Sequence, residues 1–214
     1  MPFLQEQYSR TATRDVRSAM ALALTRHLAA LRFSSGAGQF MFAEVFDEWP
    51  SYSQKYIAPS AAVLPGSWTY GDAYLTPTLM EDTWEPKGER GFGLYKLSEI
   101  EVTLEVSMRT NSTAEREAIV AIVEQSFRHP ELLMSQAGAR NGILLPMPEY
   151  YGLCARFALL SGRVIDDEDR AMRENRDAIL NVSAQATQVA VGPVSPLNLK
   201  VRQMVGPEVD LENC

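Results

Sequence analysis

The sequence contains few of the residues from which most catalytic and metal sites are built. It has two histidines and two cysteines in 214 residues, and the members of each pair lie far apart. It has no GxSxG elbow, no P-loop, no GxGxxG after a strand, and no HExxH or CxxC motif. A zinc site needs several such ligands brought together. The sequence therefore predicts no enzymatic activity, no metal site and no cofactor.

Basic residues and long apolar runs are also scarce. The chain has 20 Lys and Arg against 27 Asp and Glu, which gives a net charge of −7. Proteins that bind nucleic acid through its phosphates concentrate basic residues on one face, so this balance argues against direct DNA binding. No apolar run approaches the ~20 residues that span a bilayer, and the first residues lack a signal-peptide core. These features predict a protein made in the cytoplasm without membrane association.

The two cysteines fit the same compartment. A reducing cytoplasm keeps cysteines as thiols. Cys154 lies in an apolar, strand-like run, so we expect a buried free thiol there. Cys214 is the last residue of the sequence, and we expect it to be exposed. A disulfide between the two is the alternative.

The most regular pattern in the sequence runs from Glu99 to Arg109. Apolar and polar residues alternate strictly here, which is typical of a strand with one buried face. A helix is predicted directly after it, because Ser112 and Glu115 match a capping box. The apolar stripe of that helix consists of Ile119, Ile122, Val123 and Phe127.

The polar face of the predicted strand carries three carboxylates, Glu99, Glu101 and Glu105. Paired carboxylates can perform acid–base chemistry, but only in a cleft that separates their pKa values. A row of carboxylates along a strand is more typical of a solvated or subunit-facing surface. We therefore interpret these residues as a surface feature.

Other segments complete an α+β pattern. Apolar spacing predicts a helix over about 15–33, capped by Thr13 or Asp15, with His27 in a structural role near its apolar stripe. Strands are predicted over 40–46, buried on both faces, and over 150–165, 178–191 and 197–205, whereas 129–148 is predicted to be a loop. The expected fold is one domain over 1–214 with a mostly antiparallel or mixed sheet, flanked by two α-helices.

Residues 49–95 form a long aromatic excursion rich in proline and glycine. Proline excludes a continuous helix. Ala61–Leu64 is a candidate short strand, and the rest is either an irregular excursion or an extended hairpin. Either this excursion covers the sheet as a flap, or it is an arm that packs on a neighbouring subunit or partner. Trp and Tyr are favoured interface anchors. The candidate interface residues are Trp49, Tyr52, Tyr56, Trp68, Tyr70, Tyr74 and Trp84.

Three parts of the sequence together resemble a known family. The first is the N-terminal amphipathic helix with the Phe40–Phe46 strand and its Asp47-Glu48-Trp49-Pro50 exit. The second is the Leu104-Glu105-Val106 strand that leads into Ser112-Thr113-Ala114-Glu115-Arg116-Glu117. The third is the C-terminal strand set, 151–160 and 197–205. In this order of elements the chain resembles the tail terminator, or tail completion, proteins of tailed bacteriophages.

The resemblance implies a ring, usually hexameric, that caps the tail tube below the head–neck connector. The partners would be further copies of the chain, the tail tube protein, the connector protein and, as a further candidate, the tail sheath. DNA would pass through the lumen without sequence-specific binding, and Glu99, Glu101 and Glu105 would face that lumen. The protein would be made in the cytoplasm of the host bacterium and reside in the tail and neck region of the virion.

Two other interpretations remain open at this point. The chain could be another neck, head-closure or baseplate component of the same virions. It could instead be a cytoplasmic small-molecule-binding module, with the Trp- and Tyr-rich excursion lining a pocket.

Overall fold

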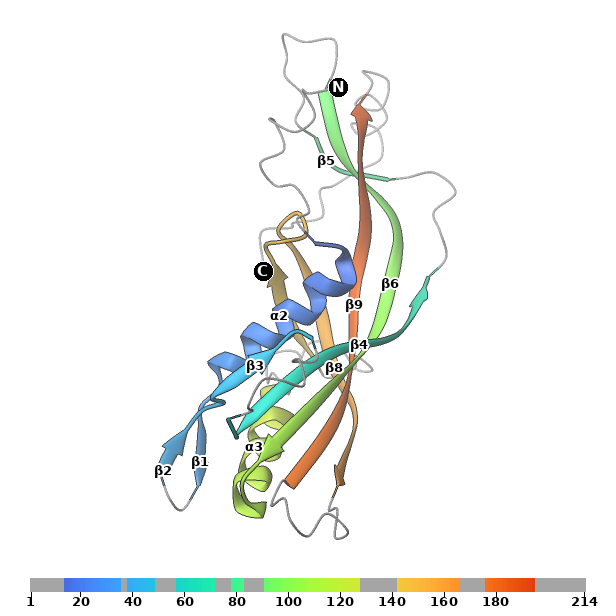
Figure 1. Ribbon diagram of the computed structural model, residues 1–214. Helices are drawn as coiled ribbons and strands as arrows, with labels where there is room; N and C mark the ends of the chain where they lie inside the picture. Colours follow the sequence, from blue (N-terminus) through green and yellow to red (C-terminus); the bar gives the residue numbers. More distant parts are fainter. Residues whose placement is uncertain are drawn as a thin grey trace. The chain divides into compact units, whose positions relative to one another are not determined.

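The computed structural model describes residues 14–35, 38–48, 57–71, 78–82, 91–127, 142–165 and 176–194. It contains two helices and a curled, strand-rich mixed sheet, which confirms the predicted α+β class (Figure 1). The chain divides into two compact units. Unit 1 comprises Met1–Trp68 and Val102–Gln185, and unit 2 comprises Thr69–Glu101 and Ala186–Cys214.

The main sheet has the strand order β3-β4-β6-β9-β8-β7, with β5 also paired to β6. Its strands are β3 (Glu44–Phe46), β4 (Ser60–Tyr70), β5 (Thr78–Asp82), β6 (Gly91–Thr110), β7 (Ile143–Met147), β8 (Leu153–Ile165) and β9 (Arg176–Val194). β3 runs parallel to β4, whereas β8 is antiparallel to both of its neighbours, β7 and β9. The sheet is therefore mixed. Among the strand pairs whose register is described, only β3–β4 is parallel, and it lies at one edge of the described part.

The predicted alternation of β6 is confirmed, and the strand is longer than expected. Leu104, Val106 and Met108 are fully buried, while the residues between them are half-buried. β9 repeats the pattern, since Leu180, Val182 and Ala184 are each at most 1% exposed. Two adjacent strands thus present one apolar face. At about 25 cal/mol per Å² of buried apolar surface, burial of this face stabilises unit 1.

The helix α3 (Thr113–Ser126) follows β6 after a two-residue break, as predicted. The Ser112 hydroxyl accepts a hydrogen bond from the Glu115 backbone N–H at 3.2 Å. The Glu115 carboxylate accepts one from the backbone N–H of Asn111 at 3.0 Å, one residue earlier than a standard capping box. Both ends of this contact satisfy backbone donors that the first helical turn would leave unpaired.

The helix α2 (Val16–Ala30) begins at the predicted Asp15 cap but ends earlier than predicted. The expectation of a single buried strand over 40–46 is wrong. The chain instead forms a hairpin from β1 (Phe33–Ser35) and β2 (Gly38–Phe40), and β3 follows separately. Phe42, between β2 and β3, packs edge-on against Phe33 at 4.9 Å between ring centroids. This aromatic contact requires the chain to turn back, which neither a longer helix nor a straight strand would allow.

Part of the predicted excursion is sheet. β4 begins where the short strand was expected but continues through Pro65 and Gly66 to Tyr70. A Cβ at position 66 would lie 2.9 Å from the carbonyl oxygen of Thr103, so glycine permits β4 to approach β6 there. Trp68 and Tyr70 are therefore strand residues. The other candidate interface residues, Trp49, Tyr52, Tyr56, Tyr74 and Trp84, lie outside the described residues.

The prediction of a loop over 129–148 is wrong at its end, where β7 pairs with the first half of β8. Pro146 marked this segment as a loop, but proline is tolerated in an edge strand. The strand predicted over 150–165 is confirmed as β8, which begins at Leu153, and its residues 160–164 are exposed. β9 covers the predicted strand over 178–191, and residues 197–205 lie outside the described part.

The expectation for Cys154 is corrected as well. Its sulfur is disulfide-bonded, so it is not a free thiol. Cys214, the other cysteine of the sequence, lies outside the described residues.

Replacing Ser112 by Ala should lower the free energy of unfolding by about 1 kcal/mol, because the Glu115 N–H loses its acceptor. Urea unfolding followed by circular dichroism measures the change. Ser112→Asp, which restores an acceptor, serves as the control. An Ala variant as stable as the parent chain would show that this cap contributes nothing.

Candidate interaction surfaces

The sheet of unit 1 has a polar face opposite its apolar core, and the registers define which residues share it. On β8, Arg156 lies opposite Gln185 and Arg163 lies opposite Ile179, so both arginines project on one face of β9. They are seven residues apart, which would place them on opposite faces of a regular strand. The register shift between Leu159 and Ser161 leaves Leu160 as an extra residue and brings the two onto the same face.

The carboxylates of β6 belong to this same face. In unit 2, the Thr187 hydroxyl of β9 donates to the Glu99 carboxylate at 3.4 Å, so odd-numbered residues of the two strands project together. Glu105 and Arg109 occupy odd positions of β6 in unit 1 and are half-buried. We refer to Glu105, Arg109, Arg156 and Arg163 as the polar face of unit 1.

The predicted row of carboxylates is therefore part of a surface of mixed charge. Glu105, Arg156 and Arg163 make no ion pair or hydrogen bond of their side chains within the described residues. In unit 2, Glu99 is exposed and forms an ion pair with Lys96, while Glu101 is half-buried. Arginine and lysine thus offset the charge that the sequence pattern of β6 alone would suggest.

Trp68 is the described aromatic residue of unit 1 best placed as an anchor. It is 47% exposed on β4, and the Arg17 guanidinium lies over its ring at 4.5 Å from the centroid. Arg17 is itself held by the Asp15 carboxylate, at 3.2 Å from its Nε. A cation over an indole contributes about 0.5–1 kcal/mol at an exposed site. The indole is therefore held in a defined position while half of it faces solvent. Tyr70, in unit 2, is 56% exposed.

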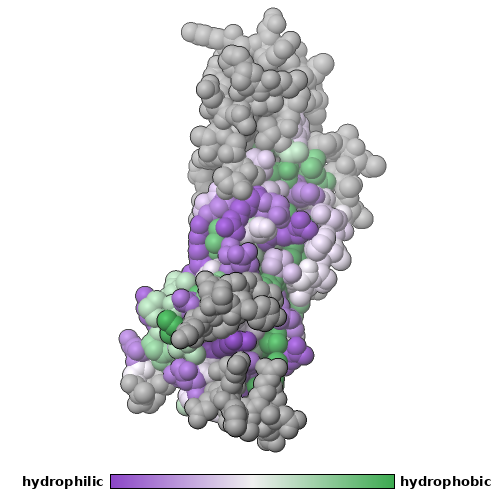
Figure 2. All heavy atoms as spheres, viewed as in Figure 1, coloured by the Kyte–Doolittle hydropathy of each residue, from purple (hydrophilic) through white to green (hydrophobic). Residues whose placement is uncertain are grey.

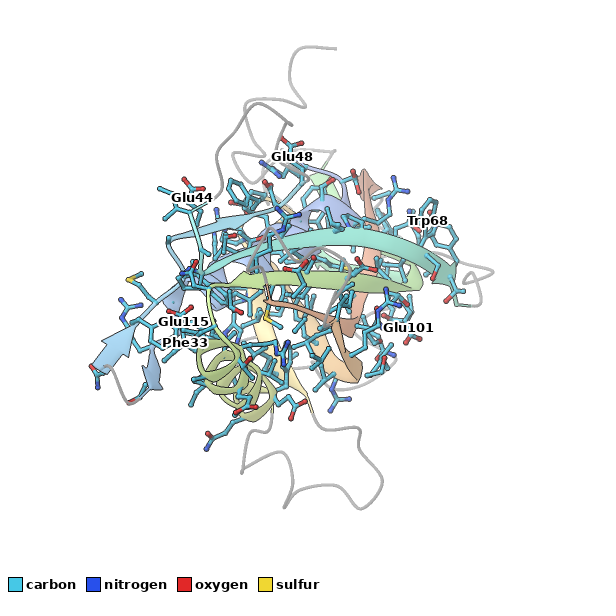
Figure 3. The ribbon with its side chains drawn as sticks, turned by 60° about the horizontal axis from the view of Figure 1, so that its bottom comes forward. Phe33, Glu44, Glu48, Trp68, Glu101 and Glu115 are labelled. Carbon is cyan, nitrogen blue, oxygen red and sulfur yellow. The ribbon has the colours of Figure 1, made fainter. Side chains whose placement is uncertain are left out.

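The two edges of the unit 1 sheet carry opposite charge. Glu44 and Glu48 lie exposed at the β3–β4 edge, and Figure 3 shows both projecting outward there. On the other side, Arg163 lies exposed on the half of β8 beyond its pairing with β7, whereas Arg156 is half-buried and pairs with Leu144 of β7. None of these four side chains has an ion-pair partner among the described residues. Sequence analysis did not identify the edges, because their composition depends on which strands end up outermost.

Charged contacts that the sequence did not reveal connect α2 to the loops around it. Arg26 makes a two-fold contact with the Glu149 carboxylate in the turn before β8, with 3.0 Å between Nη1 and Oε2. This hydrogen bonding holds the pKa of Glu149 below its usual value. Arg14 forms an ion pair with Asp47 just after β3. These pairs are partly exposed and contribute modestly, but they fix the positions of both sheet edges relative to α2.

His27 has a structural environment, as its sequence context indicated. Its Nε2 lies 3.0 Å from the Ser126 hydroxyl, and its ring lies 6.0 Å from that of Phe127. The Ser126 hydroxyl donates to the Val123 carbonyl at 2.7 Å, so Nε2 must be the donor to Ser126. Burial lowers the pKa of His27 below its ordinary value. The imidazole therefore joins α2 to α3 in its neutral form.

Hydrophilic residues predominate among the coloured residues in Figure 2, and hydrophobic residues occur there in small groups. Within the described ranges, no three His, Cys, Asp or Glu side chains gather as a metal site would require. Neither described helix is long and apolar enough to cross a membrane. Comparisons with protein families and with curated proteins found no match to this chain.

His27 should make the stability of the protein depend on pH between about 7 and 5. Its pKa is lowered in the folded state, so its contribution is complete above the ordinary value near 6.5 and is lost as pH falls. His27→Gln keeps a donor for Ser126 and does not titrate. The difference in free energy of unfolding between the parent chain and this variant should shrink or change sign at pH 5. A difference that is the same at both pH values would contradict this.

Proposed function

We propose that the chain is a structural subunit of a tailed-bacteriophage virion, and that it forms a ring that caps the tail tube and joins it to the head–neck connector. The observation that carries the proposal is the open sheet of unit 1, with one acidic and one basic edge. The second part of the resemblance adds support, because the strand that contains Leu104-Glu105-Val106 leads directly into α3.

The charges favour a ring over a two-fold dimer. A two-fold contact joins the same surface of both subunits, so it would bring Glu44 and Glu48 near their own copies, or Arg163 near its own copy. A head-to-tail contact joins opposite edges and brings carboxylate to guanidinium. Head-to-tail contacts close into a ring when a whole number of identical rotations from one subunit to the next adds up to a full turn. The same contacts also remove the open strand edges that otherwise invite uncontrolled pairing.

The polar face suits a lumen through which DNA slides. A surface with arginines alone would bind phosphates and slow the passage of DNA. In the proposed ring, Glu99, Glu101 and Glu105 would offset most of the charge of Lys96, Arg109, Arg156 and Arg163, which would weaken the hold of the lumen on DNA. The partners would be the neighbouring subunits, the tail tube protein and the connector protein. The exposed aromatic residues of β4 would supply anchors for one of these contacts.

A ring predicts a discrete mass well above that of the monomer. Native mass spectrometry of the purified chain should give one dominant oligomer, six subunits being the number expected from the resemblance, and negative-stain microscopy should show annular particles. A monomer at all concentrations, stabilised by a member of a metabolite panel, would instead support a small-molecule-binding module.

Removing the carboxylates should make the ring retain DNA. The double variant Glu101→Gln and Glu105→Gln increases the excess of basic side chains in the proposed lumen. Duplex DNA should then bind at low salt, with an affinity that falls steeply as salt rises. Glu117→Gln changes the charge of an exposed residue of α3 and is the control. Equal DNA binding by the double variant, the control and the parent ring would show that these carboxylates do not face the DNA.

A further inference from the structure

Each edge of the unit 1 sheet is stepped, because a short outer strand covers only part of a longer one. β3 pairs with β4 as far as Ala62, which leaves Val63–Tyr70 without a ladder partner on that side in the described part of the chain. β7 pairs with β8 as far as Phe157, which leaves Ala158–Ile165 likewise without a ladder partner on that side in the described part of the chain. Within the described residues each segment has eight residues; Thr69 and Tyr70 of the first belong to unit 2, and the description of β8 ends at Ile165.

The strand directions determine how such segments could meet. Gly66 lies against Thr103 within unit 1, and Gly71 donates to the Glu99 carbonyl within unit 2, so β4 and β6 are antiparallel. Ser98 contacts Gln188 and Glu99 contacts Thr187, so β6 and β9 are antiparallel too. β9 and β8 are antiparallel by their register. β4 and β8 therefore point in opposite directions, and rotation about an axis along the strands preserves that relation between copies.

We propose that Val63–Tyr70 of one copy lies antiparallel beside Ala158–Ile165 of the next copy, and that this is the subunit contact of the ring. The inference rests on the proposed function. When the ends of the two segments are aligned, Trp68 falls opposite Leu160 and Leu64 falls opposite Val164. Trp68, Leu160 and Val164 are 47%, 50% and 52% exposed, and all three are apolar side chains that such a contact would bury.

The same alignment pairs opposite charges. Glu48 lies exposed in the bend two residues after Phe46, whose register partner is Ala62. Arg163 of the neighbouring copy falls opposite Pro65, three residues beyond Ala62, and can reach Glu48 from there. Figure 3 shows Glu48 projecting from the β3–β4 edge and Trp68 near the far end of β4. The apolar pair and the ion pair thus occupy separate points along one contact.

Two local features, the extra residue in β8 and the cation over Trp68, fit this arrangement. The extra residue in β8 is Leu160, which is displaced from the ladder with β9 and is half exposed. The Arg17 guanidinium holds the Trp68 ring on the opposing segment, so less side-chain entropy is lost when that ring is buried. Pro65 has no N–H and interrupts any continuous ladder, so the side chains carry most of the specificity.

A charge-reversal experiment tests the contact. Glu48→Arg and Arg163→Glu should each raise the concentration needed for ring formation at least about tenfold, because like charges then meet at every interface. The double variant, Glu48→Arg with Arg163→Glu in the same chain, should restore most of the assembly. Native mass spectrometry across a dilution series measures all three. Both residues are exposed, so circular dichroism should show unchanged folding.

A second pair of variants addresses the apolar contact. Trp68→Ala and Leu160→Asp should each disrupt the ring, whereas Met41→Ala, at an exposed apolar residue away from both segments, should not. If the parent chain forms rings and none of the edge variants weakens them, the contact is wrong although the proposed function stands. If the double charge variant stays disrupted, the pairing of Glu48 with Arg163 is wrong. If the parent chain is a monomer, both proposals fail.

Discussion

The apolar face shared by β6 and β9 is the constraint on which the other elements depend. Leu104, Val106 and Met108 on one strand and Val182 on the other are fully buried, and they exist as a face only because the two strands alternate in phase. A shift of either strand by one residue would bring their polar residues into the core. The same phase therefore fixes which charged side chains appear together on the opposite side of the sheet.

Features encoded in a single segment were predictable from the sequence. The alternation of β6 and the Ser112 cap of α3 need no knowledge of the rest of the chain, and both are confirmed. β7 and the second half of β4 were not predictable, because Pro65 and Pro146 read as loop signals. Proline is tolerated there since both strands are edges, and an edge is defined only once the whole sheet has formed.

The candidate surfaces show the same contrast between features that one segment encodes and features that depend on the assembled sheet. The carboxylates of β6 were found from the pattern of that strand, but the arginines that accompany them were not. Arg156 and Arg163 are separated by an odd number of positions, so any rule based on alternation places them on opposite faces. One extra residue at Leu160 reverses that result. The charge of the polar face thus depends on a local irregularity that sequence periodicity does not encode.

Stepped edges also explain how an open sheet could assemble in one direction only. The exposed backbone of an edge strand pairs with almost any other strand, so specificity has to come from side chains and from what the prolines forbid. Here the acidic edge carries Pro65 and the basic edge carries the irregularity at Leu160, so neither edge is complementary to itself. Only unlike edges match in charge. The proposed contact between unlike edges would give closed or continuing head-to-tail assemblies.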